Sequence, residues 1–233
     1  QVRRLAPRLI LEQTRRGLPR SSGVSKRRIR AATVGGDIDL DRSMDSVLGA
    51  RAEGRRARLD ELLVSDWAKP ELALCLVIDR SGSMNGARLT TAAVAAAACA
   101  SLAPRENAVI TFAALVDVLK PMQERHPASE TVASILSLRG HGTTSLSAAL
   151  EQARRQLGRA AARRKVTLLL SDCRATDDHD PVPAARRVPE LLILAPESDH
   201  EQAAELAARS NARWAPVAGP SDAPGVLRSL LGG

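Results

Sequence analysis

Residues 72–84 read LALCLVIDRSGSM: an apolar run leads directly into Asp79, and a turn rich in serine follows. A continuous apolar run of this length is typical of a strand covered on both faces, as in a parallel sheet. The polar turn would then lie at the carboxyl end of that strand, where ligands bind in open α/β sheets. This stretch therefore predicts the fold class and the place of the functional site.

The rest of the chain alternates between strand-like and helix-like patterns. We expect strands at 108–112, 116–119, 166–170, 191–194 and 213–217, and helices at 85–102, 129–137, 146–157, 200–208 and 222–231. Alternation of this kind predicts an α/β fold, a doubly wound and mostly parallel sheet with helices on both faces. The strand at 116–119 is expected to pair antiparallel at one edge.

The first part of the chain has a different character. Residues 1–30 hold ten Lys or Arg and one acid, a net charge of +9, so the remaining residues sum to −1 within the total of +8. We expect residues 1–67 to form a basic, partly disordered or docked extension, with a short helix over 41–47 capped by Asp41 or Ser43. Residues 68–233 form the predicted domain.

Composition excludes several classes of protein. The chain has one Phe, two Trp and no Tyr, so aromatic platforms that stack nucleobases are almost absent. No apolar run approaches the roughly 20 residues that cross a bilayer, and no signal-peptide pattern is visible. Three cysteines without CxxC spacing argue against disulfides and zinc, and favour a reducing, cytoplasmic compartment.

Hydroxyl and carboxylate oxygens gather at the expected ends of the strands and in the loop before residue 146. Asp79, Ser81 and Ser83 follow the first strand, Asp172 follows the strand at 166–170, and Thr144 precedes the helix at 146–157. Hydroxyls and carboxylates without imidazole or thiolate suit Mg²⁺, Mn²⁺ or Ca²⁺. The two carboxylates would neutralise a dication. The sequence therefore predicts a divalent-metal site, with Mg²⁺ or Mn²⁺ as the expected cofactor.

These motifs resemble those of von Willebrand factor A (VWA) domains over about residues 70–230. DRSGSM matches the DxSxS signature, Thr144 in GTTSL matches the threonine of the second loop, and Asp172 in LLLSDC matches the aspartate of the third. The resemblance implies a metal-ion-dependent adhesion site. In it Ser81, Ser83 and Thr144 contact the metal directly, and Asp79 and Asp172 act largely through water. Thr143 is the alternative ligand of the second loop, and Cys173 stands where many members have Gly.

The resemblance also implies what the metal does. Such sites leave one coordination position for a Glu or Asp of a partner protein, which makes the metal the adhesive. Around it we expect Met84, His141, Thr143 and Arg174 to contact that partner. The GTTSL loop and the WAKPELALCLVIDRSGSM segment are most similar to chelatase D-type subunits and to VWA partners of MoxR-type AAA+ ATPases. The implied role is a non-enzymatic adaptor for such an ATPase.

Alternatives remain open. The Arg-rich residues 1–30 could bind nucleic acid or an acidic surface with the VWA domain as scaffold, although no nucleic-acid motif is present. A metal-assisted hydrolase is a distant third, because the G-x-S-x-G pattern is missing. His179 and the acidic residues around it could line the metal face together with His141, or form a solvated loop. Cys173 could be a redox-sensitive thiol or a small buried residue.

Overall fold

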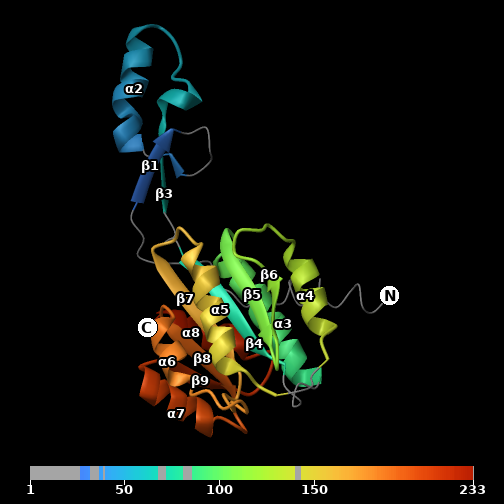
Figure 1. Cartoon of the computed structure of the whole chain (residues 1–233). Helices are drawn as coiled ribbons and strands as arrows, with labels where there is room; N and C mark the ends of the chain where they lie inside the picture. The colour runs from blue at the N-terminus through green and yellow to red at the C-terminus, as the bar shows by residue number, and fades with distance from the viewer. Residues whose placement is uncertain are drawn as a thin grey trace. The chain divides into compact units, whose positions relative to one another are not determined.

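The computed structural model describes residues 27–31, 37–38, 40–67, 72–80, 86–139 and 143–232, and Figure 1 draws the whole chain. These residues fall into two compact units, a small one within residues 27–67 and a large one from residue 72 to residue 232. Each unit is described by itself below. Ser81, Ser83, Met84 and His141, named above as site residues, lie outside the described part.

The small unit is a three-stranded antiparallel sheet with one α-helix. Its strands are β1 (Arg27–Ala31), β2 (Asp37–Ile38) and β3 (Leu63–Trp67), with β3 in the middle. Helix α2 (Leu40–Ala52) and the 3₁₀ helix η2 (Leu59–Glu61) lie between β2 and β3 in the chain. Strand β1 lies within residues 1–67, which the sequence predicts as an extension, and it forms by pairing with residues more than thirty positions away.

Helix α2 also corrects the predicted cap. The helix begins at Leu40 and runs to Ala52, so Asp41 and Ser43 lie inside it and neither is its cap. The buried Ser43 hydroxyl instead accepts a hydrogen bond from the Leu63 amide at 2.9 Å and lies 3.2 Å from the Leu63 carbonyl oxygen. In the sequence alone, a serine at this position resembles a helix N-cap, although its hydroxyl contacts Leu63, twenty positions away.

The large unit contains a six-stranded sheet in the order β6-β5-β4-β7-β8-β9. All neighbours are parallel except β6, which pairs antiparallel with β5 at one edge. The bounds are β4 (Leu72–Asp79), β5 (Glu106–Phe112), β6 (Val116–Lys120), β7 (Arg164–Leu170), β8 (Leu191–Pro196) and β9 (Arg213–Val217). The predicted fold class, including the antiparallel edge strand, is confirmed.

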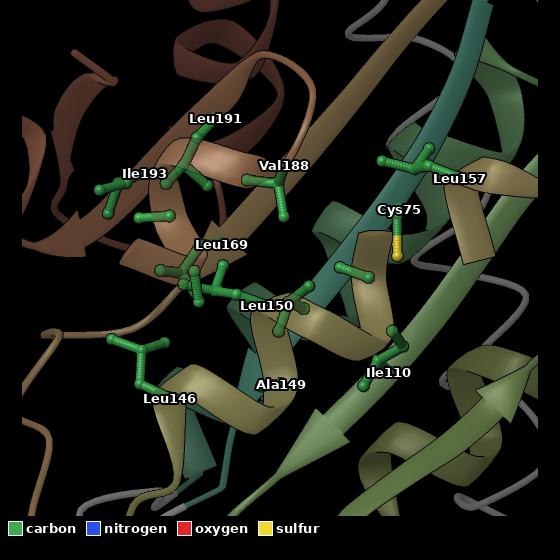
Figure 2. Packing of buried hydrophobic residues seen from close by; sticks show 14 of the residues in the cluster. Cys75, Ile110, Leu146, Ala149, Leu150, Leu157, Leu169, Val188, Leu191 and Ile193 are labelled. Atoms are coloured by element: carbon green, nitrogen blue, oxygen red, sulfur yellow. The ribbon is translucent and has the colours of Figure 1, made fainter. Parts of the chain in front are cut away.

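Helices cover both faces of this sheet. One face packs against α5 (Leu146–Gly158), α6 (Val182–Arg187) and α7 (Glu201–Ser210), and the other against α3 (Gly86–Leu102), α4 (Ala128–Leu136) and α8 (Ala223–Gly232). Figure 2 shows Leu146, Leu150 and Leu157 of α5 lying among buried strand residues of the first face. Helix α6 was not predicted, because its short sequence follows an acidic, loop-like stretch.

The order of the strands fixes where a site can form. After β4 the chain builds β5 and β6 on one side, and then returns through α5 to place β7 on the other side of β4. The connections therefore diverge between β4 and β7, and a crevice opens at the carboxyl ends of these two strands. The predicted metal motifs follow β4 and β7.

Candidate metal centre

Two buried carboxylates stand at the ends of the two central strands. Asp79 is the last residue of β4, and Asp172 follows β7 by two positions; they are 5% and 8% exposed. Ile78 pairs with Leu170 in the parallel register, so the two strands end side by side. A pair of carboxylates removed from water in this way needs positive charge or hydrogen-bond donors nearby.

Ser171 connects the two acids. Its hydroxyl donates to Asp79 Oδ2 at 2.7 Å and accepts from the Cys173 amide at 2.8 Å. The Arg174 amide donates to Asp172 Oδ1 at 3.1 Å. One oxygen of each carboxylate is thus held by the loop after β7, which fixes the orientation of both groups before any ligand arrives.

Arg88 places a positive charge beside Asp172. Its guanidinium lies 3.6 Å from Asp172 Oδ2, the oxygen that the Arg174 amide does not hold. Arg88 is in the first turn of α3, and it is the single charged residue of that helix, whose sequence is GARLTTAAVAAAACASL. The arginine therefore stands beside one of the two acids expected to neutralise a metal.

Thr144 is held next to the loop that carries Asp172. Its amide donates to the Thr176 hydroxyl at 2.7 Å, and the Thr176 amide donates back to the Thr144 carbonyl at 3.3 Å. The Ser145 amide donates to the carbonyl of Ala113, just beyond β5. Thr144 is 2% exposed. Thr143 is exposed.

Cys173 shows how the third loop keeps its shape without glycine. Its φ is +62°, the left-handed conformation that glycine adopts freely and other residues rarely do. Burial raises the pKa of the Cys173 thiol, and the neighbouring carboxylates of Asp172 and Asp79 raise it further. The thiol is therefore a protonated, 4% exposed core group at neutral pH, not a reactive thiolate.

The remaining predicted contacts are placed as follows. Arg174 is exposed, and its guanidinium pairs with Asp199 at 2.7 Å, so its side chain is held away from Asp172 by a second acid. His179 is exposed and lies 3.8 Å from Asp177, whose Oδ1 is buried without a hydrogen-bond partner. Asp180 pairs with Arg209.

A pocket of about 300 Å³ adjoins the two carboxylates. Besides Asp79 and Asp172 it is lined by Arg88 and Thr91 of α3 and by the ends of β8 and β9, including Glu197. It lies at the carboxyl edge of the sheet, where the strand order predicts a ligand site. Sequence reasoning missed Ser171, Thr176 and Arg88. Only Arg88 leaves a signal, as a lone charge in an alanine-rich helix.

The donors present fit a hard divalent cation. The described residues contain no group of three or more His, Cys, Asp or Glu that could hold a metal, which leaves hydroxyls to complete any set around the two carboxylates. Thr144 is buried and brings a hydroxyl, and the two acids are already oriented by hydrogen bonds. Oxygen-only donors of this kind are those that Mg²⁺ and Mn²⁺ prefer.

The doubly wound sheet, with buried acids on β4 and after β7 and a buried threonine between them in sequence, defines a VWA-type domain. The chain belongs to the family of VWA domain containing CoxE-like proteins, whose sequence profile matches residues 8–223. A VWA domain is a protein-interaction module, often a metal-dependent one. The predicted family resemblance is therefore confirmed.

Solved structures share the fold at low sequence identity. An aerotolerance-related membrane protein from Bacteroides fragilis is 13% identical, with a TM-score of 0.55 over 70% of this chain and all of its own. A von Willebrand factor type A protein from Catenulispora acidiphila is 18% identical, with a TM-score of 0.55 over 72% of this chain and 43% of its own. Manganese-loaded TRAP protein from Plasmodium vivax is 13% identical, with a TM-score of 0.54 over 70% and 74%.

A comparison with curated protein sequences gave no match. Among the described residues, no helix is both long enough and apolar enough to cross a membrane.

Proposed function

We propose that this chain is a divalent-metal-dependent protein-docking module that binds without catalysing a reaction. The observation that carries the proposal is the pair of oriented, buried carboxylates Asp79 and Asp172, together with the buried Thr144, whose backbone is held by the loop that carries Asp172. Ser81 and Ser83 join the set from the sequence pattern alone, because they lie outside the described residues. The similar fold of TRAP protein is known in a manganese-loaded form.

In the proposed site the chain's own residues do the positioning. Ser171 and the Arg174 amide hold the two carboxylates, and Thr144 offers its hydroxyl from the neighbouring loop. Mg²⁺ or Mn²⁺, when bound, supplies a Lewis-acidic position that an oxygen of a partner carboxylate can fill. Met84, His141, Thr143 and Arg174 are the proposed surroundings of that contact.

We propose a MoxR-type AAA+ ATPase as the partner, with the VWA domain as its adaptor. Support comes from membership of the CoxE-like family and from the sequence resemblance to VWA partners of such ATPases. A cytoplasmic location accompanies this role, and the free thiols of Cys75, Cys99 and Cys173, all buried, are compatible with it.

The first experiment measures Mn²⁺ binding by electron paramagnetic resonance and follows thermal stability at rising Mn²⁺ and Mg²⁺. We expect saturable binding and stabilisation in the wild type, both lost in Asp172→Asn. Asp178→Asn is the matched control, because Asp178 is an exposed acid of the same loop. Equal binding by wild type and Asp172→Asn would refute the proposed site.

The second experiment tests docking. A purified MoxR-type ATPase should bind the chain with Mn²⁺ present, and both EDTA and Asp79→Asn should abolish the complex. Acetate should compete, because it offers the same carboxylate. If a partner or nucleic acid instead binds equally in EDTA and dissociates steeply with salt, the basic residues 1–30 carry the interaction.

A further inference from the structure

A second cavity lies at the opposite edge of the sheet from Asp79 and Asp172. It has a volume of about 240 Å³ and is lined by residues from the end of α3, the start of β5, the segment after β6 and the first turn of α4. Asn107 stands near the amino end of β5, and Lys120 is the last residue of antiparallel β6. The cavity is thus separate from the candidate metal centre.

Lys120 places a buried ammonium in the wall of this cavity. It is 5% exposed, and its Nζ donates to the Asn107 carbonyl at 2.5 Å and lies 3.5 Å from the Pro121 carbonyl. In the described part of the chain, the hydrogen bonds of this ammonium go to carbonyl oxygens. Burial lowers the pKa of Lys120, and Glu124 nearby acts in the opposite direction. Two carbonyl oxygens contact an ammonium that has three donors, and they leave its charge without a full counter-charge, so the wall favours an anion.

Further positive charge surrounds the opening. Arg105 and Arg125 line the cavity, both are exposed, and neither forms an ion pair with any described residue. Glu124 is the single acid in the lining, and it already interacts with His126 at 2.9 Å. Arg105, Arg125 and Lys120 thus line the cavity with a single carboxylate, and the lining carries net positive charge.

Thr131 adds a buried, unpartnered hydroxyl to the residues that line the cavity. It lines the cavity in the first turn and a half of α4, it is 7% exposed, and its Oγ1 has no hydrogen-bond partner. No side chain caps α4 either, because Pro127 occupies the cap position. An unpaired buried hydroxyl is costly, and an uncapped helix N-terminus favours negative charge.

We propose that this basic cavity, formed around Lys120, Arg105, Arg125 and Thr131, binds a small phosphate-bearing anion. Donors approach from the end of β6, from two loops and from the start of α4, which suits a tetrahedral anion with several oxygens better than a planar carboxylate. The volume admits a phosphate that carries a small organic group. Inorganic phosphate and a low-molecular-weight phosphate ester share this chemistry.

Calorimetric titration of the full chain with inorganic phosphate, and separately with glycerol 3-phosphate, tests the proposal at constant ionic strength. We expect saturable binding that Arg125→Gln weakens by about tenfold or more, since hydrogen bonds to charged groups are strong. Arg159→Gln is the matched control, because Arg159 is exposed and outside the cavity lining. Tighter binding of one ligand identifies the source of the phosphate.

Thr131→Val distinguishes a lost phosphate contact from a failure to fold. Without phosphate, this nearly isosteric variant should melt at the wild-type temperature or above, because an unpartnered buried hydroxyl is removed. With phosphate, it should gain less stability than the wild type. The proposal is overturned if neither phosphate compound binds, if sulfate and chloride produce the same heat, if only a phosphopeptide binds, or if all variants bind equally.

Discussion

Replacing Arg88 by glutamine should strengthen metal binding. In the structure the Arg88 guanidinium lies 3.6 Å from Asp172 Oδ2, and Asp172 is one of the two acids proposed to neutralise the metal. The same cation would repel an incoming dication. Glutamine removes the charge and keeps much of the length and hydrogen-bonding capacity of the side chain.

The magnitude follows from the distance. Two unit charges at this separation interact by about 4.6 kcal/mol at an effective dielectric constant of about 20. The Arg88 side chain is 29% exposed, so screening reduces the realised coupling to roughly 1–2 kcal/mol. Mn²⁺ and Mg²⁺ should therefore bind the Arg88→Gln variant about 5- to 30-fold more tightly than the wild type.

Mn²⁺ titration followed by electron paramagnetic resonance measures the affinity directly. Arg174→Gln is the control, since Arg174 also lies in the loop that carries Asp172 but its side chain pairs with Asp199. Its effect on Mn²⁺ affinity should be smaller. The electrostatic reasoning would be refuted if Arg88→Gln bound Mn²⁺ as tightly as the wild type or more weakly, while Asp172→Asn still failed to bind it. That result would show that Arg88 does not compete with the metal.

Three further outcomes are expected. In urea denaturation, the free energy of unfolding of Cys173→Val should be about 1–2 kcal/mol or more below that of Cys173→Gly. A β-branched residue tolerates a φ of +62° poorly, and glycine tolerates it well. Equal urea midpoints for the two variants would contradict this. Ser171→Ala should cost about 1–3 kcal/mol in urea denaturation, since it leaves a buried Asp79 oxygen without its 2.7 Å donor. Glu190 hydrogen-bonds two arginines, and these bonds, Arg164 foremost, hold the pKa of its carboxyl below the usual value. A lowered folded-state pKa gives stability that is present above the unfolded pKa of about 4.3 and is lost as pH falls through the folded value. Glu190→Gln should thus be less stable than wild type at pH 7, and the difference should shrink below about pH 4; a difference independent of pH would contradict this.

The large sheet was predictable because its signals are local. Each buried strand is a short apolar run bounded by polar turns, and the apolar residues of helices such as α5 and α7 recur at helical spacing. The small unit was not predictable in this way. Strand β1 has the sequence RRIRA, which carries no alternating apolar pattern, and only its pairing with β3 defines it.

In the candidate site, too, residues marked by a local motif were predictable and residues placed by long-range contacts were not. Asp79, Thr144 and Asp172 were found because a motif marks each of them at the end of a strand or the start of a helix. Ser171 and Arg88 act through contacts across the fold, 92 positions from Asp79 in the case of Ser171. No spacing rule in one sequence reports such a contact.

Helix α3 has one more consequence. Residues 91–99 are all buried, so every face of this middle part of the helix packs against the protein, and the whole helix is about 25 Å long. Its first turn carries Arg88, and its last turns help to line the basic cavity. If phosphate alters Mn²⁺ affinity by some factor through this helix, thermodynamic reciprocity requires Mn²⁺ to alter phosphate affinity by the same factor. A single measurement in either direction then gives the coupling energy between the two ends of the domain.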